Sequence, residues 1–220
     1  MAGGVAIYVH KSLSYITRED LAINVNNQFE SVFIEVKGVK ETVIVGEIYR
    51  VPNTNVKISI ERFHDIADKI KAINCDSIIG TDQNFDLLTY NHNKNTKELL
   101  DGMIGSGLIP CITKPTRITH TSATLIDNLY LNGHNCYTYY QAGIIESDIS
   151  DHLPVIVFTR KKLNKQKGFT LLSYRKYDKH VYDQITENLK IKTGIYGKLT
   201  AISAKLFIIA LPHITWNIIQ

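Results

Sequence analysis

The chain has few of the residues that mark a thiolate metal site or a disulfide-stabilised fold. Its 220 residues include only three cysteines, Cys75, Cys111 and Cys136, and no two of them form a Cys-x-x-Cys pair. Cysteines that are odd in number and widely spaced predict reduced, mostly buried thiols of an intracellular protein, and they argue against a zinc site.

Long apolar runs are also missing. The best candidate, residues 206–211, is cut short by Pro212 and His213, whereas a membrane-spanning helix needs about 20 apolar residues. The apolar run at 4–9 is too short for a secretion signal and no basic residues precede it. We therefore expect no membrane partner.

Charge of one sign is not strongly in excess, because the net charge is only +4. This mild basicity is compatible with a polyanionic partner but does not require one. Hydrophobic residues make up 44% and charged residues 21% of the chain, which is typical of a globular protein. The length suits one sizeable domain, alone or with an appendage.

Hydrophobic periodicity predicts a layered fold of many short strands and two helices. One helix follows the Asn-rich segment 53–55 and repeats Ile60, Phe63, Ile66 or Ala67, and Ile70 at helical spacing. A second helix is expected over 96–106, capped by Asn95. It should bury Leu99, Leu100, Met103 and Ile104. Strands are expected at 5–9, 30–36, 42–49, 76–79, 125–131, 137–141 and 153–158.

These elements predict a mixed α/β or α+β fold. The turn at 38–40 is short enough for a hairpin, and Asn132-Gly133 predicts a second hairpin. Residues 160–167 carry five basic residues in eight, which suits either a solvated linker or an arm that tracks phosphates. We predict a main domain over 1–160, then a basic linker and appendage over 161–220. Within the appendage we expect a helix at 177–189 and a tail outside the main core.

Polar side chains recur at the ends of the predicted strands. Asp151 and His152 directly precede the apolar run 154–158. A carboxylate can hold a hard metal ion, and a histidine can bind or protonate a phosphate oxygen near neutral pH. The alternative is a turn in which the polar groups merely satisfy the backbone.

Three further positions fit the same pattern. Tyr49 ends one strand and could donate to a phosphate, or it is a half-buried strand tyrosine. Asp82 and Asn84 follow another strand, either to orient water or a metal or to form a turn. Asp127 lies among apolar neighbours and needs a partner, which is either a structural group or His152. Together the residues suggest one polar rim built from separate strands, as in many hydrolytic sites.

The ordered motifs resemble the exonuclease-endonuclease-phosphatase superfamily, and specifically the apurinic-type endonuclease domain of non-LTR retrotransposons. The resemblance covers roughly residues 3–160. The matching motifs are Tyr49-Arg50-Val51-Pro52, Gly80-Thr81-Asp82-Gln83-Asn84, Pro115-Thr116-Arg117, Ile126-Asp127 and Ser150-Asp151-His152.

The resemblance implies a sandwich of two β-sheets flanked by helices, incomplete at the N-terminus, and Mg²⁺-dependent cleavage of DNA phosphodiesters. We expect no small-molecule cofactor beyond the metal ion. We expect the protein to be intracellular and located in the nucleus. It implies that Asp82 orients or deprotonates the attacking water and that Asn84 helps to hold water and phosphate. His152, oriented by Asp127, would contact the scissile phosphate, with support from Tyr49. Asp151 would lie at the metal. The expected DNA-binding residues are Arg50, Thr116 and Arg117.

Two departures from the family pattern leave other functions open. The family has Gly-Asp-Phe-Asn where this chain has Gly80-Thr81-Asp82-Gln83-Asn84, and the chain begins after the family's strand with an Asn and its segment with a metal-binding Glu. We therefore expect an N-terminally truncated retroelement endonuclease. The alternatives are an inactive retroelement fragment that binds nucleic acid, and a phosphoesterase acting on a substrate other than DNA.

Overall fold

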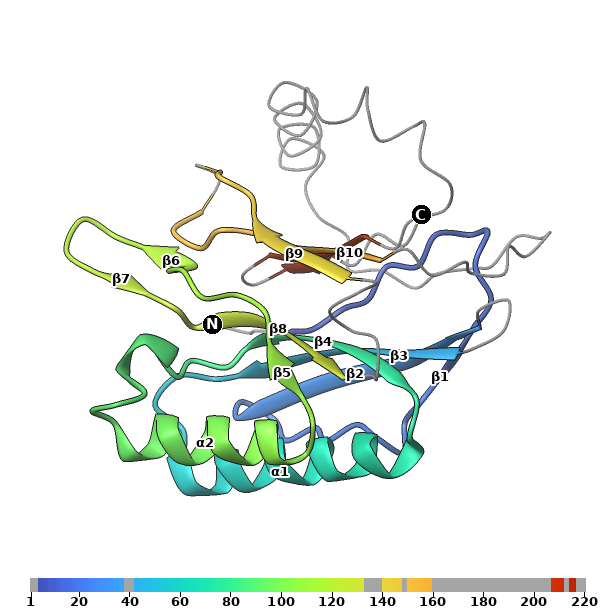
Figure 1. Ribbon diagram of the computed structural model, residues 1–220, viewed down its shortest axis with the longest axis horizontal. Helices are drawn as coiled ribbons and strands as arrows, with labels where there is room; N and C mark the ends of the chain where they lie inside the picture. The colour runs from blue at the N-terminus through green and yellow to red at the C-terminus, as the bar shows by residue number, and fades with distance from the viewer. Residues whose placement is uncertain are drawn as a thin grey trace.

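The computed structural model describes residues 4–37, 42–132, 140–147, 150–159, 207–211 and 214–216. They form two facing β-sheets with two helices on the outer side of the larger sheet (Figure 1). The predicted two-sheet α+β architecture is therefore confirmed. The predicted helix at 177–189, the basic run and Cys136 lie outside the described residues. Among the described residues, no helix is long and apolar enough to span a membrane.

The larger sheet is mixed, with the strand order β1-β2-β3-β4-β8-β5. Strands β2 and β3 are antiparallel, as the predicted hairpin requires. Strands β3 and β4 are parallel and are connected through helix α1. The strand bounds are β1 Tyr15–Thr17, β2 Phe29–Lys37, β3 Thr42–Arg50, β4 Asp76–Asp82, β5 Ile109–Pro110 and β8 Asp127–Asn132.

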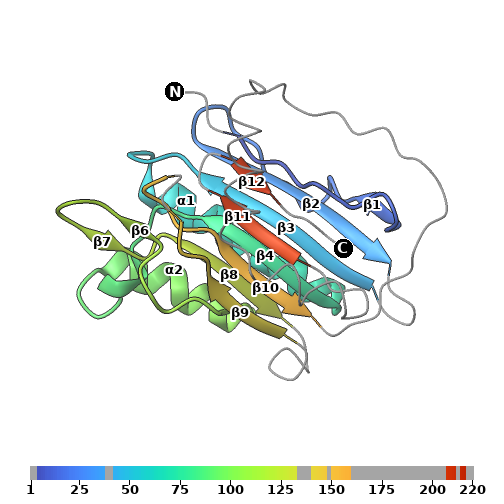
Figure 2. The ribbon, with the colours of Figure 1, turned by 90° about the horizontal axis from the view of Figure 1, so that it is seen from above.

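The smaller sheet is antiparallel and has the order β12-β11-β10-β9. Its bounds are β9 Tyr140–Ile144, β10 Val155–Thr159, β11 Phe207–Leu211 and β12 Ile214–Trp216. Strand β11 pairs with β10, so part of the tail expected to lie outside the main core contributes to this sheet. A separate small hairpin joins β6, Arg117–Ile118, to β7, Ala123–Thr124. Figure 2 shows the smaller sheet lying over the larger one.

The helix predictions hold in their main features. Helix α1 spans Val56–Ile73, and the side chain of its N-cap Asn55 accepts from the N–H of Ile58. Helix α2 spans Lys94–Gly105 and begins two residues before the expected start, because Asn93 rather than Asn95 caps it. Its Leu99 and Met103 are buried as predicted, but Ile104 is exposed. A short 3₁₀ turn, η1, covers Leu87–Thr89.

Two strand predictions were wrong. Residues 5–9 form no named strand, because β1 rather than this run pairs with β2; Val9 still packs into the core between the sheets. The hairpin expected at Asn132-Gly133 does not join β8 to β9. Strand β8 already pairs with β4 on one side and β5 on the other, and β9 pairs with β10 in the smaller sheet.

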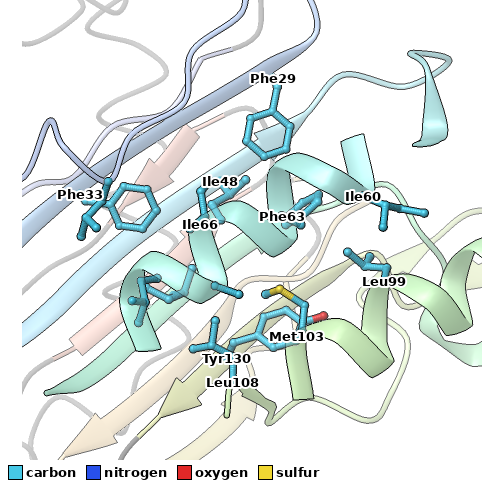
Figure 3. Close-up of a cluster of buried hydrophobic side chains, with 14 of the residues drawn as sticks. Phe29, Phe33, Ile48, Ile60, Phe63, Ile66, Leu99, Met103, Leu108 and Tyr130 are labelled. Atoms are coloured by element: carbon cyan, nitrogen blue, oxygen red, sulfur yellow. The ribbon is translucent and has the colours of Figure 1, made fainter. Parts of the chain in front are cut away.

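Two apolar clusters hold the layers together. One fills the space between the sheets and includes Val45, Ile78, Leu129 and Val157. The other lies between the larger sheet and the helices, where Phe29 and Phe63 meet edge to face with ring centroids 5.1 Å apart. Figure 3 shows this second cluster. Alternate residues of β3 and β4 therefore face different clusters, which determines where their terminal polar residues point.

Candidate active site

The candidate site begins as a row of three side chains across the larger sheet. Tyr49 at the end of β3 pairs in register with Asp82 at the end of β4, and Asp82 pairs with Asp127 at the start of β8. Each lies an even number of residues from strand neighbours that face the smaller sheet, namely Val45, Ile78 and Leu129. Because side chains alternate along a strand, all three residues are on the side of the sheet that faces β10.

His152, just before β10, completes the row from the other sheet. Its Nδ1 lies 3.0 Å from Oδ2 and 3.2 Å from Oδ1 of Asp127. Both side chains are about 5% exposed. Burial alone would lower the pKa of His152, but the hydrogen bond to Asp127 and the charges of Asp127, Asp82 and Asp151 raise it above its ordinary value. The predicted carboxylate–histidine pair is therefore present, and it favours the protonated imidazole.

Thr116 and Arg117 fix this pair in place. The hydroxyl of Thr116 accepts hydrogen bonds from the N–H groups of Asp127 at 3.0 Å and Ile126 at 3.3 Å. Arg117 pairs with His152 in an isolated antiparallel bridge, and the carbonyl of Thr116 accepts from the N–H of Leu153 at 2.5 Å. Thr116 is fully buried, so we correct its expected DNA contact: its side chain positions Asp127 instead.

Asp82 is the least satisfied carboxylate in this part of the structure. Its Oδ1 is buried and has no hydrogen-bond partner among the described residues. Burial and the neighbouring charge of Asp127 raise the pKa of Asp82 to about 7, against the smaller opposing effects of His152, Arg117 and the backbone N–H of Asn84. A carboxylate with an unpaired oxygen and a pKa near neutrality suits proton transfer or the binding of a cation.

Asp82, Asp127 and His152 each offer a ligand atom within 4.8 Å of the others. A carboxylate oxygen without a partner is a donor that Mg²⁺ accepts, so the residues present fit a hard divalent cation at Asp82. Asp151, the predicted metal ligand, is not in this cluster. Its Oδ2 accepts from Nε of Arg117 at 2.7 Å on the surface, and this contact holds the pKa of Asp151 below its usual range.

Asn84 and Arg50 lie beside this cluster and hold each other. The side-chain amide of Asn84 donates to the backbone carbonyl of Arg50 at 2.7 Å, and the Arg50 guanidinium donates to the carbonyl of Asn84 at 3.1 Å. Arg50 was expected to bind DNA, but it is 4% exposed. Its guanidinium lies 4.4 Å from the centre of the Phe85 ring. The Arg50 guanidinium is therefore packed against Phe85 and is not exposed on the surface where DNA was expected to bind.

The unusual Gln83 has a structural explanation that the sequence did not reveal. Its Oε1 accepts a hydrogen bond from the hydroxyl of Tyr130 at 2.8 Å, and its amide donates to the carbonyl of Phe85 at 3.4 Å. Both Gln83 and Tyr130 are fully buried. The polar side chain of Gln83 is thus paired inside the core, between Asp82 and Asn84 in the sequence.

The remaining predicted residue, Tyr49, lies next to Asp82 in the row. Burial and the charges of Asp82 and Glu30 raise its pKa, so its hydroxyl remains protonated and available as a hydrogen-bond donor. Cys75 and Cys111 are half-buried.

Comparison with known proteins gives matches among solved structures alone. No protein-family model and no curated protein sequence matches the chain. The endonuclease domain of TRAS1, a telomere-specific non-LTR retrotransposon, aligns with a TM-score of 0.51 and 17% identity over 70% of each chain. D. rerio TDP2 complexed with a single-strand DNA product gives 0.48 and 11% identity, over 64% of this chain and 66% of the other.

The catalytic domain of Xenopus laevis APE2 gives a TM-score of 0.48 and 16% identity, over 64% of this chain and 57% of the other. At such identities a likeness speaks for the fold, and the alignment with the TRAS1 domain agrees with the two facing sheets described above. The chain therefore shares its fold with the endonuclease domain of TRAS1.

Proposed function

We propose that the protein is a Mg²⁺-dependent phosphodiesterase that nicks DNA, as in target-site cleavage by a retrotransposon. The observation that carries this proposal is the buried Oδ1 of Asp82, which has no hydrogen-bond partner in the described part of the chain and lies beside the Asp127–His152 pair. An unpaired buried carboxylate oxygen is destabilising. A site that keeps such an unpaired oxygen next to a hydrogen-bonded imidazole is suited to bind a ligand or to accept a proton.

Asp82 and His152 take different roles in the proposal, although the surroundings of each raise its pKa. Asp82, with its pKa near 7, orients the attacking water and accepts its proton, which contributes roughly 10²–10⁴-fold to the rate. His152, kept protonated by Asp127, donates to an oxygen of the scissile phosphate. Tyr49 supports that phosphate through its hydroxyl, and Asn84 holds the water.

The carboxylate of Asp82 would hold the metal ion, and Asp151 would join it only by exchanging its ion pair with Arg117. When bound, Mg²⁺ stabilises negative charge on the phosphate. Arg117 is 44% exposed in its side chain, so it is the predicted DNA-binding residue that reaches solvent. A DNA substrate in turn favours a nuclear location for the protein.

A nicking assay on supercoiled plasmid tests the proposal. The wild-type protein should convert the plasmid to open circles with Mg²⁺ and lose this activity in EDTA, while His152→Ala should lower the rate at least 10²-fold. His64→Ala is a matched control, since His64 is half-buried between the helices away from the site. Equal nicking by wild type and His152→Ala, or by neither, contradicts the proposal. If the protein hydrolysed a phospholipid or inositol phosphate and did not cleave DNA, the proposed substrate class would be wrong.

A further inference from the structure

Arg50 is a buried cation whose guanidinium donates to backbone carbonyls. No ion pair of Arg50 occurs within 4.0 Å among the described residues, and its guanidinium donates to two backbone carbonyls, of Asn84 at 3.1 Å and Thr54 at 3.2 Å. Burial lowers the pKa of Arg50, partly offset by the charge of Asp82. Burying a charge without an ionic partner is unfavourable, so the position calls for a reason other than stability.

The reason lies in the backbone that Arg50 holds. Asn84 has φ of 51°, in the left-handed region that non-glycine residues seldom adopt. Its side-chain amide donates to the carbonyl of Arg50 while its own carbonyl accepts from the Arg50 guanidinium. The two contacts form a closed, reciprocal pair between the last residue of β3 and the loop after β4. They fix both the main chain and the side chain of Asn84.

The same loop touches the reacting carboxylate. The backbone N–H of Asn84 hydrogen-bonds to Asp82, so the turn that Arg50 fixes also sets one contact of that group. The orientation of the Asn84 side-chain amide is also fixed, because its NH₂ group donates to the carbonyl of Arg50. Stacking on Phe85, one residue further along, adds a third point of attachment between Arg50 and this loop.

We propose that Arg50 is a positioning residue that locks Asn84 in its left-handed conformation and so fixes the geometry of Asn84 and Asp82 for the reaction. The effect on catalysis rests on the proposed function. The clamp, by which we mean the two reciprocal hydrogen bonds between Arg50 and Asn84, does not depend on it. The clamp acts through Asn84, since Arg50 is buried and offers no group to substrate.

Two variants and one matched control test this. Arg50→Met keeps an unbranched side chain over Phe85 but removes every side-chain hydrogen-bond donor. Arg50→Lys keeps the positive charge but lacks the planar guanidinium that donates to two carbonyls at once. Arg62→Met is the control, because Arg62 also lies over a phenylalanine ring, Phe29 at 5.9 Å, yet contacts Gln28 rather than the site. The first measurement is hydrogen–deuterium exchange of a peptide covering residues 82–86, which needs no activity.

We expect exchange in this peptide to become at least tenfold faster in both Arg50 variants and to stay unchanged in Arg62→Met. In the nicking assay, kcat should fall about 10²-fold with little change in KM, as for a misplacement of catalytic groups. In an Asn84→Ala background, Arg50→Lys should add almost nothing to the loss, because the two residues act as one unit.

Unchanged exchange at 82–86 in Arg50→Lys overturns the proposal, and so does a full additional loss of kcat in the Asn84→Ala background. If Arg50→Met fails to fold, the Lys variant still gives both readouts. Faster exchange together with a wild-type protein that nicks no DNA would support the clamp while refuting the proposed function, so the two failures are distinguishable.

Discussion

Replacing Asp82 by Asn should make the protein more stable while removing its activity. The folded-state pKa of Asp82 is raised from 3.8 to about 7, so folding favours the protonated carboxyl. Its ionisation therefore destabilises the folded protein progressively as the pH rises from about 4 to about 7, and the loss is complete above that range. Asparagine resembles the protonated acid in shape and charge, and it avoids this loss.

The size of the effect follows from the pKa difference. At about 1.4 kcal/mol per pH unit, the rise from 3.8 to about 7 sets an upper limit of about 4 kcal/mol. Partial access of solvent to Asp82 reduces it, so we expect the free energy of unfolding of Asp82→Asn to exceed that of wild type by about 1–4 kcal/mol at pH 8. The two proteins should be nearly equal at pH 4.

Urea unfolding at pH 4, 6 and 8 in the presence of EDTA measures this difference directly. Asp65→Asn is a suitable control, because Asp65 is exposed on helix α1, and its effect should be within about 0.5 kcal/mol at each pH. A difference for Asp82→Asn that does not change with pH, or a variant that is less stable than wild type at pH 8, would refute the reasoning.

Three other predictions address the support of the site. Thr116→Val leaves the buried N–H groups of Ile126 and Asp127 unpaired, so chemical denaturation should show a loss of about 1–3 kcal/mol, absent from the exposed Thr113→Val. Tyr130→Phe removes the donor to Gln83 and should lower stability by about 1–3 kcal/mol, with most of the loss recovered by adding Gln83→Met. The rate of nicking should have a bell-shaped dependence on pH. It should rise as Asp82 ionises, at or below about pH 7 because a bound cation favours the carboxylate. It should fall at higher pH as His152 loses its proton, because Asp127 raises the pKa of His152 above its ordinary value. Asp127→Asn should shift the falling limb to lower pH, and an unshifted limb would count against the pair.

Much of the larger sheet follows from local pattern. The apolar face of α1, the alternation in β2 and the apolar run of β3 predicted these elements, because each of these signals is local in the sequence. The run in β3 is apolar because its residues alternately face the two clusters. The prediction that β8 and β9 form a hairpin was wrong, because Asn132-Gly133 indicates a local turn and carries no information on which sheet each strand joins. The pairing of β11 with β10 is similarly long-range, and composition alone does not encode it.

The candidate site divides in the same way. Asp82, Asp127 and His152 were predicted from their place at the ends of strands, and the register of β4 with β8 brings the two carboxylates side by side. Arg50 and Thr116 were expected to bind DNA because the family resemblance implied it. Their burial and their hydrogen bonds to the backbone depend on loops meeting in space, and no spacing in the sequence indicates this.

The central claim is that Asp82 is a reacting group of a Mg²⁺-dependent nuclease. The most direct measurement is the rate of plasmid nicking by wild type and Asp82→Asn side by side at pH 7.5, with Mg²⁺ added and then removed by EDTA. We predict nicking by wild type that depends on Mg²⁺, and a rate at least 10²-fold lower for a folded Asp82→Asn protein. Equal rates for the two proteins, or no Mg²⁺-dependent nicking by a folded wild type, would contradict the account.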